Sequence, residues 1–252
     1  LYIGEKLGSG GNLNLDIAVD PVEGTNFVAK NLPGALSVIS IAEKGNLFNA
    51  PETYMDKISA NVSEKDVVDL DFSVKKNIDN LAEYKSKRPE NLNVCILDRP
   101  RHKEIIKKLN ELKVKLKLIT DGDVSGALLV TNKKHNIDLF LGIGGGPEGV
   151  LAASALDAYN CYFQGRFLFK TENDKIRAKK MGIKNLNKKY QLNEIISGDS
   201  IFCATGITSG DLVSGINVLD NEFISETLIT HSSSGLKKTI KSKQKIWYSI
   251  FY

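Results

Sequence analysis

The stretch from Asp16 to Thr25 (DIAVDPVEGT) constrains this chain more than any other part of it. An apolar, strand-like run ends there in two carboxylates, Asp20 and Glu23. A proline after the first carboxylate fixes one backbone angle, and a glycine after the second frees another, so we expect a sharp turn just past the strand. This turn would bring both carboxylates close to the Thr25 hydroxyl.

Oxygen ligands held together in this way suit Mg²⁺ or Mn²⁺, and a hydroxyl beside such an ion can orient a water molecule. The alternative is an acidic surface turn, which this stretch taken alone does not exclude. Motifs elsewhere in the chain are needed to decide between the two interpretations.

The composition is that of an ordinary soluble protein, with 42% hydrophobic and 25% charged residues. Its 252 residues are enough for a large core or for two lobes. The net charge of +4 is spread along the chain with few aromatic residues between the basic ones, so a nucleic-acid surface is poorly supported. A small anionic substrate fits the mild positive charge equally well. Because there is no apolar run of transmembrane length and no signal-peptide pattern, we expect a cytoplasmic protein without a membrane partner.

The cysteines and histidines are scattered and show no metal-ligand spacing. We therefore expect reduced, buried thiols, and neither a histidine-based zinc site nor a Ser-His-Asp triad. The residues concerned are Cys95, Cys161, Cys203, His102, His135 and His231.

In the first part of the chain, short β-branched runs predict strands at Asp16–Val19 and Ala35–Ala42. Helical spacing of apolar residues predicts helices at Tyr54–Ala60 and Val67–Tyr84. The polar, proline-containing segment Lys85–Asn91 is the best candidate for a linker between lobes.

After this segment, strands and helices alternate, which is typical of an α/β lobe with parallel pairing. The expected strands are Asn93–Leu97, Lys115–Thr120 and Ile137–Ile143, and the expected helices are Lys103–Leu112, Pro147–Tyr159 and one that begins at Val124. We therefore predict an α+β lobe at residues 1–88, an α/β lobe at 89–240 and a tail at 241–252. Ligands of such sheets bind beyond the carboxyl ends of the strands.

A glycine-rich loop, Gly142 to Gly149 (GIGGGPEG), links the third of these strands to the next helix. Glycines let a backbone approach a ligand closely, and a helix N-terminus favours an anion, so phosphate is the natural guest. Within the loop, Glu148 either favours the helix dipole or reaches toward a cation.

Two other strand ends also carry polar side chains. Arg99 and Arg101 suit phosphate through bidentate hydrogen bonds, although a solvated basic turn is the alternative. Asp121 and Asp123 suit sugar hydroxyls or a metal, although Asp123 also fits the role of a helix N-cap.

Together these motifs resemble the class II fructose-1,6-bisphosphatases, a metal-dependent, lithium-sensitive bacterial family of the inositol monophosphatase/fructose bisphosphatase superfamily. The resemblance runs in order from Leu1 to about Ser234. The matching segments are LYIGE (1–5), DIAVDPVEGT (16–25), LPGALSVISI (32–41), YMDKI (54–58), LDRPRH (97–102), TDGDV (120–124), GIGGGPEGVLA (142–152), QGR (164–166) and ATGITSGDL (204–212).

The resemblance implies a two-lobed, layered αβαβα fold and a phosphoric monoester hydrolase of gluconeogenesis. The implied reaction releases the 1-phosphate of fructose 1,6-bisphosphate, giving fructose 6-phosphate, with Mn²⁺ or Mg²⁺ as cofactor. A homo-oligomer, either a dimer or a tetramer, is also implied.

The resemblance further implies the roles of individual residues. Asp20, Glu23 and Glu148 match metal-binding carboxylates, the first two with a catalytic role, and Thr25 matches the hydroxyl that helps activate the attacking water. The residues that match substrate contacts are Tyr54, Arg99, Arg101, Asp121, Asp123 and Gly145.

Alternative functions are a sedoheptulose-1,7-bisphosphatase, a dual bisphosphatase, or a protein that binds sugar phosphates without turnover. The last of these is motivated by a departure from the family pattern. Members carry an acidic N-terminal segment just before the LYIGE match, and the chain begins at that match. We therefore expect a natural start upstream of Leu1. The basic and aromatic end, Lys241 to Tyr252, also lacks a family counterpart.

Overall fold

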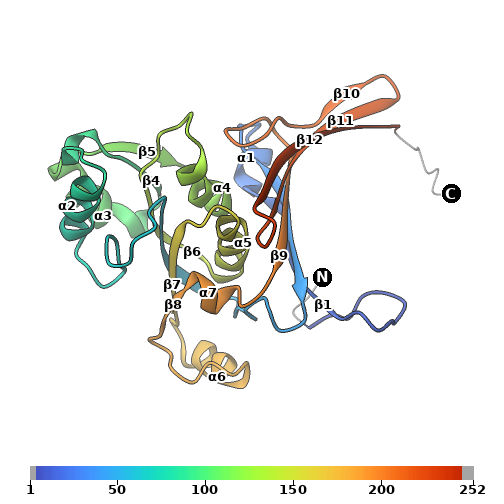
Figure 1. Cartoon of the computed structure of the whole chain (residues 1–252), viewed down its shortest axis with the longest axis horizontal. Coiled ribbons are helices and arrows are strands. Elements are labelled where there is room, and N and C mark those ends of the chain that lie inside the picture. The colour runs from blue at the N-terminus through green and yellow to red at the C-terminus, as the bar shows by residue number, and fades with distance from the viewer. Residues whose placement is uncertain (1–3, 246–252) are drawn as a thin grey trace.

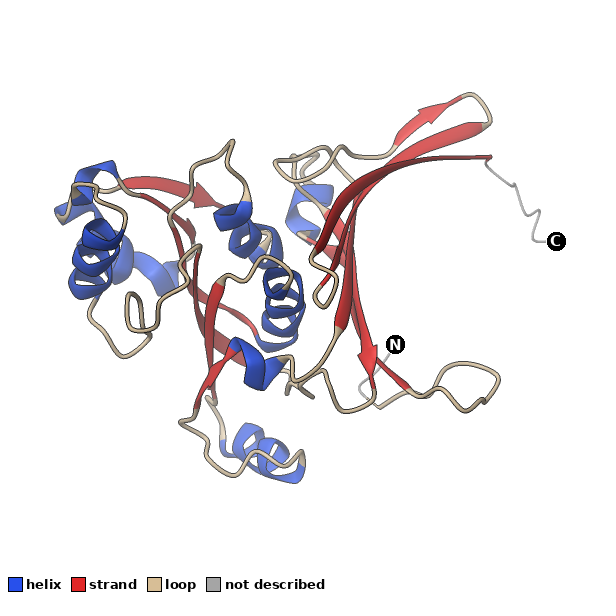
Figure 2. Cartoon of the chain, viewed as in Figure 1, coloured by secondary structure: helices blue, strands red, loops and turns tan. Residues whose placement is uncertain are grey.

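The computed structural model describes residues 4–245, which form two six-stranded sheets and several helices (Figures 1 and 2). The first sheet is antiparallel throughout and has the order β1-β2-β9-β11-β10, with β12 paired to β11. Its strands are β1 (Leu15–Glu23), β2 (Leu36–Glu43), β9 (Ser200–Gly206), β10 (Asn217–Leu219), β11 (Glu222–His231) and β12 (Leu236–Lys245).

The second sheet is mixed and has the order β5-β4-β6-β3-β7-β8. Only the pairings of β4 with β5 and with β6 are parallel. Its strands are β3 (Tyr54–Ala60), β4 (Asn93–Leu97), β5 (Lys115–Ile119), β6 (Leu139–Gly145), β7 (Tyr162–Leu168) and β8 (Lys189–Gln191).

The helices form layers around the second sheet. Helices α4 (Asp123–Leu128) and α5 (Gly146–Asp157) lie between the two sheets, and α2 (Val74–Tyr84) and α3 (Lys103–Glu111) cover the opposite face of the second sheet (Figure 2). The shorter helices are α1 (Thr25–Ala29), α6 (Glu172–Lys180) and α7 (Leu192–Ile195), with 3₁₀ turns at Pro89–Asn91, Pro100–His102 and Leu129–Thr131. The predicted α/β class is thus confirmed.

Helix α5 is buried on nearly all sides, because it packs against β1, β2 and β9 of one sheet and against β3, β6 and β7 of the other. Half of its 12 residues are glycine, alanine or serine, and these small side chains let both sheets approach the helix closely. The main hydrophobic core lies around this helix, and a second core lies beneath α2 and α3.

The outward face of the first sheet carries exposed apolar side chains. Ile17, Ile41, Ile201 and Leu236 belong to one row of cross-strand neighbours on that face, and no helix of residues 4–245 lies over it (Figure 2). In this row Ile17 is 49% exposed and Ile201 is 43% exposed. The described residues therefore contain four layers, in the order sheet, helices, sheet, helices.

The helix predicted at Tyr54–Ala60 is wrong, because this segment is strand β3. It lies between β6 and β7 in the middle of the sheet, and from Lys57 onward every residue is buried. Burial on both faces removes the alternation of apolar and polar residues by which a strand is recognised. The helix predicted at Val67–Tyr84 begins only at Val74, where the Ser73 side chain caps it.

The two sheets combine segments from both sides of residue 88, the expected boundary between lobes. Strand β3 comes from before this residue and lies in the second sheet, whereas β9 to β12 come from after it and extend the first sheet. In the expected tail, residues 241–245 form the end of β12, and residues 246–252 lie outside the described part. The three cysteines are free, with Cys95 and Cys161 buried.

None of the helices in residues 4–245 combines the length and the apolar character that crossing a bilayer requires.

A buried row of hydroxyls fixes α5 to the first sheet. The Ser154 hydroxyl lies 2.6 Å from the Ser40 hydroxyl and 2.9 Å from the Ser200 hydroxyl. We expect Ser154→Ala to lower the free energy of unfolding by about 1–3 kcal/mol, because two buried hydroxyls lose their shared partner. Urea unfolding followed by circular dichroism measures the loss. Ser9→Ala, in an exposed loop, is the matched control, and an equal effect in both variants would contradict the prediction.

Candidate active site

A cleft of about 570 Å³ lies where β1 of the first sheet faces β3 and the start of α5. Four of the residues singled out in the sequence line it, namely Asp20, Tyr54, Gly145 and Glu148. The other lining residues are Val19, Glu52, Thr53, Pro147, Leu151, Lys170 and Asp174.

Asp20 and Glu23 both lie in β1, which continues as far as Glu23. Residues three apart in a regular strand point to opposite faces, but the pairing with β2 shifts register between these two residues. Asp20 lines the cleft, and the Val22 N–H donates to its Oδ1 at 3.0 Å. Glu23 is only 2% exposed, and its Oε1 accepts a hydrogen bond from the Val124 N–H at the start of α4.

The acidic side chains of this region repel one another. Burial, together with the negative charge of Asp123, raises the pKa of Glu23 to about 8. Burial also raises the pKa of Asp20, with a further contribution from Asp121. The pKa of Glu148 is raised by burial and by Asp123 and Asp20, although Lys57 opposes the shift.

The glycine loop makes room for two of these carboxylates. A Cβ atom on Gly144 would lie 2.0 Å from Asp123 Oδ2, and one on Gly145 would lie 1.9 Å from Glu148 Oε2. Both carboxylates therefore pack directly against the end of β6, at positions where any side chain on the strand would displace them. The Gly145 carbonyl accepts a hydrogen bond from Lys57 at 2.7 Å.

Thr25 is the first residue of α1 and is exposed. It follows Gly24, which adopts the left-handed conformation with φ of 83° and so provides the expected sharp turn. Strand β1 ends at Glu23, four residues later than the predicted end at Val19, and the turn follows it. Thr25 is not among the residues that line the cleft.

Asp121 contacts both Asn26, in helix α1 just after β1, and Arg99, in the turn after β4. Its Oδ2 accepts hydrogen bonds from the backbone and the side-chain amide of Asn26, both at 3.0 Å. Its Oδ1 lies 3.2 Å from the Arg99 guanidinium. The charge of Asp121 also reaches Asp20 and Glu23, so this carboxylate belongs to the acidic region around the cleft.

Two cationic groups lie beside the ring of Tyr54, which lines the cleft. The Arg101 guanidinium lies 5.0 Å from the centre of the Tyr54 ring, and the Lys170 ammonium lies 4.4 Å from it. The Arg101 Nε–H donates to the Ile143 carbonyl at 2.8 Å, which anchors this arginine to β6. A ring with two adjacent cations suits a phosphate group.

The next residue, His102, is fully buried and supports this turn. The Ile143 N–H donates to its Nε2 at 2.7 Å, so its Nδ1 carries the proton and donates to the Leu97 carbonyl at 2.7 Å. Burial lowers the pKa of His102. Its neutral ring therefore links β4 to β6 beneath Arg101.

The donor set fits a hard divalent cation. Glu23 Oε2 and Asp123 Oδ1 are buried without a hydrogen-bond partner. The pKa values of Asp20, Glu23 and Glu148 are raised mainly by burial and further by neighbouring carboxylates, so a bound cation would favour their charged forms. Among residues 4–245, however, no three acidic, cysteine or histidine side chains converge closely enough to hold a metal by themselves.

Comparisons with known proteins identify the family of the chain. Residues 1–244 match the sequence profile of the family described as bacterial fructose-1,6-bisphosphatase, glpX-encoded. The chain belongs to this family. The resemblance read from the motifs is thereby confirmed.

Curated relatives are named D-fructose 1,6-bisphosphatase class 2/sedoheptulose 1,7-bisphosphatase. The protein of Synechococcus sp. (strain JA-3-3Ab) is 37% identical over 93% of this chain and 75% of its own length. The protein of Trichodesmium erythraeum is also 37% identical over the same shares. The protein of Synechocystis sp. is 36% identical over 95% of this chain and 77% of its own length.

Motif reading did not single out three residues that this family member brings to the site. Lys170 and Asn26 are isolated polar residues with no local motif around them. Lys57 lies within the YMDKI segment, but a helix prediction there gave no reason to expect a buried lysine. The alternation of exposed Tyr54 with buried Met55 is the one local sign that the segment is a strand.

We expect Gly145→Ala to displace the Glu148 carboxylate, because the new methyl group would occupy its position. The affinity for Mn²⁺ should fall by roughly 10- to 100-fold, which is the usual effect of changing a residue that orients a metal ligand. Electron paramagnetic resonance of free Mn²⁺ measures the change. Gly11→Ala, at a glycine with open space around it, is the control, and unchanged affinity in Gly145→Ala would contradict the placement of Glu148.

The buried Glu23 should also make stability depend on pH in the presence of EDTA. Its pKa is about 8 in the folded chain and 4.5 in the unfolded chain, so the folded state binds more protons between these values. The free energy of unfolding should therefore fall by a few kcal/mol as the pH rises from about 5 to 8, with a slope of at most about 1.4 kcal/mol per pH unit.

Glu23→Gln should remove most of this slope, because an amide does not titrate. Urea unfolding at a series of pH values measures it. A wild-type profile as flat as that of Glu23→Gln would be inconsistent with a protonated Glu23 at neutral pH.

Proposed function

We propose that this chain hydrolyses the 1-phosphate of fructose 1,6-bisphosphate, giving fructose 6-phosphate and phosphate. The observation that carries the proposal is one cleft that Asp20, Glu148, Tyr54 and Lys170 line together, with the Arg101 guanidinium 5.0 Å from the centre of the Tyr54 ring. A sugar bisphosphate needs both carboxylates for a metal and cations for phosphate.

Asp20, Glu23 and Glu148 would hold Mn²⁺ or Mg²⁺, which supplies charge neutralisation at the scissile phosphate and lowers the pKa of a bound water. The Thr25 hydroxyl orients the attacking water. Arg101 and Tyr54 hold the distal phosphate, which sets the length of substrate that fits.

The remaining predicted contacts complete the substrate site. Asp121 and Asp123 accept hydrogen bonds from sugar hydroxyls, Arg99 contacts phosphate, and the Gly145 backbone contacts the substrate. This assignment is supported by the ion pair of Arg99 with Asp121, whose carboxylate is close enough to influence Asp20 and Glu23. The proposed reaction needs no covalent intermediate on the protein.

Sedoheptulose 1,7-bisphosphate is a second candidate substrate, favoured by the double name of the curated relatives. The two sugars differ by one hydroxymethine unit, so a dual activity is compatible with the same cleft. We also propose that the protein acts in the cytoplasm as a homo-oligomer, either a dimer or a tetramer. The division into functional lobes at residue 88 stays a prediction.

Thr25→Ala separates an enzyme from a protein that only binds sugar phosphates. For the enzyme we expect kcat to fall by about 10²–10⁴-fold with little change in substrate affinity, because the water loses its orienting group. Phosphate release and calorimetric titration with fructose 6-phosphate measure the two quantities. Thr239→Ala, on the exposed strand β12, is the control. Absence of phosphate release by the unmodified protein with Mn²⁺ would overturn the proposal.

A further inference from the structure

Lys57 is a fully buried lysine in the centre of the molecule, and no role in the reaction has been given to it above. Its side chain is 1% exposed and is among the largest of the fully buried ones. A buried ammonium is costly unless strong acceptors surround it, so its contacts are expected to matter for whatever the site does.

The strand context explains how a lysine reaches this position. Lys57 lies in β3, and its cross-strand neighbours are Gly142 in β6 and Gly165 in β7. Its aliphatic stem passes beneath α5, since a Cβ on Gly149 would lie 3.5 Å from Lys57 Cδ. The absence of a side chain at Gly149 therefore lets α5 pack closely over this part of β3.

The ammonium joins the beginnings of two helices. It forms an ion pair with Asp123 Oδ2 at the first residue of α4, and it donates to the Gly145 carbonyl at 2.7 Å, directly before α5. Glu148 lies in the first turn of α5, and the charge of Lys57 acts on it as well. One cation thus holds the Asp123 carboxylate directly and acts through its charge on a second carboxylate, Glu148.

We propose that Lys57 is a positioning residue. It holds the Asp123 carboxylate in place to bind a sugar hydroxyl, and its positive charge offsets part of the negative charge beside Glu148, one of the proposed metal ligands. This proposal rests on the proposed function, because it assumes that sugar and metal share the cleft. With Lys57 in place, Asp123 Oδ2 is fixed and Oδ1, which has no protein partner, is left for a ligand.

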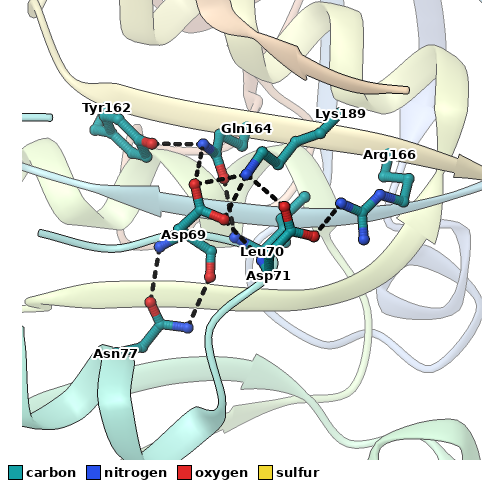
Figure 3. Close-up of polar contacts among 8 residues, drawn as sticks. All are labelled: Asp69, Leu70, Asp71, Asn77, Tyr162, Gln164, Arg166 and Lys189. Carbon is teal, nitrogen blue, oxygen red and sulfur yellow. Dashed lines mark hydrogen bonds and ion pairs between the residues drawn. The ribbon is translucent and has the colours of Figure 1, made fainter. Parts of the chain in front are cut away.

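A purely structural role is the alternative, and the chain contains a matched example of it. The Lys189 ammonium lies 2.5 Å from Asp69 Oδ1 and 2.7 Å from Asp71 Oδ2, and Figure 3 shows it between these two carboxylates. This lysine also bridges two acceptors, but it lies on edge strand β8 and its partners do not line the cleft. Lys189→Met therefore removes a comparable ion pair away from the site.

Lys57→Met should change two affinities in opposite directions. Binding of Mn²⁺ should tighten by roughly tenfold, because the substitution removes a positive charge near Glu148, a proposed ligand of the cation. Binding of fructose 6-phosphate, measured without metal, should weaken by roughly tenfold, because Asp123 loses its anchor. Global loosening of the fold would weaken both. Paramagnetic resonance and calorimetric titration of the whole chain give the two values, and Lys189→Met should leave both unchanged.

If Lys57→Met does not fold, Lys57→Gln keeps a hydrogen-bond donor without the charge and should still tighten Mn²⁺ binding. If the unmodified chain binds both probes, two results would overturn the role of Lys57 and leave the proposed function standing. Either Lys57→Met binds both probes as Lys189→Met does, or Lys57→Met loses affinity for both. An unmodified chain that binds neither Mn²⁺ nor fructose 6-phosphate would instead overturn the proposed function.

Discussion

The burial of α5 between two sheets is the constraint on which the rest of the molecule depends. A helix in which half of the residues are glycine, alanine or serine lets β1 of one sheet and β3 of the other approach the same place. The first turn of that helix carries Glu148, so a carboxylate is delivered to the meeting point of both sheets. At the end of β1, Glu23 is buried against the start of α4, and this burial is the main cause of its raised pKa.

The sequence identified local pieces of the site better than it identified their partners. The strands before the Asp20, Arg99 and Glu148 motifs were recognised, because β-branched runs bounded by turn residues are local signals. Strand β3 was not, since a central strand buried on both faces has no alternation to read. Its partners β6 and β7 lie far along the chain, and pairing over such distances leaves no local trace. For the same reason the buried Lys57 resembled an ordinary solvent-exposed lysine.

The glycine loop illustrates how one pattern serves two physical purposes. Glycines before a helix indicate a place where backbone approaches a ligand, and phosphate was the expected guest. In the structure, the space that Gly144 and Gly145 leave open is occupied by the carboxylates of Asp123 and Glu148. These two purposes are compatible, because a carboxylate that lies against the strand can hold the cation that faces a phosphate. Only the coordinates reveal which atoms fill the space.

Strand β3 carries both Tyr54 and Lys57 in one unbroken register. Tyr54 at its beginning lies beside the cations Arg101 and Lys170. Lys57 lies three residues further along, and because successive side chains of a strand alternate between the faces of the sheet, it points to the opposite face, where it pairs with Asp123. Hydrogen bonding to β6 on one side and to β7 on the other fixes the places of both residues within the sheet.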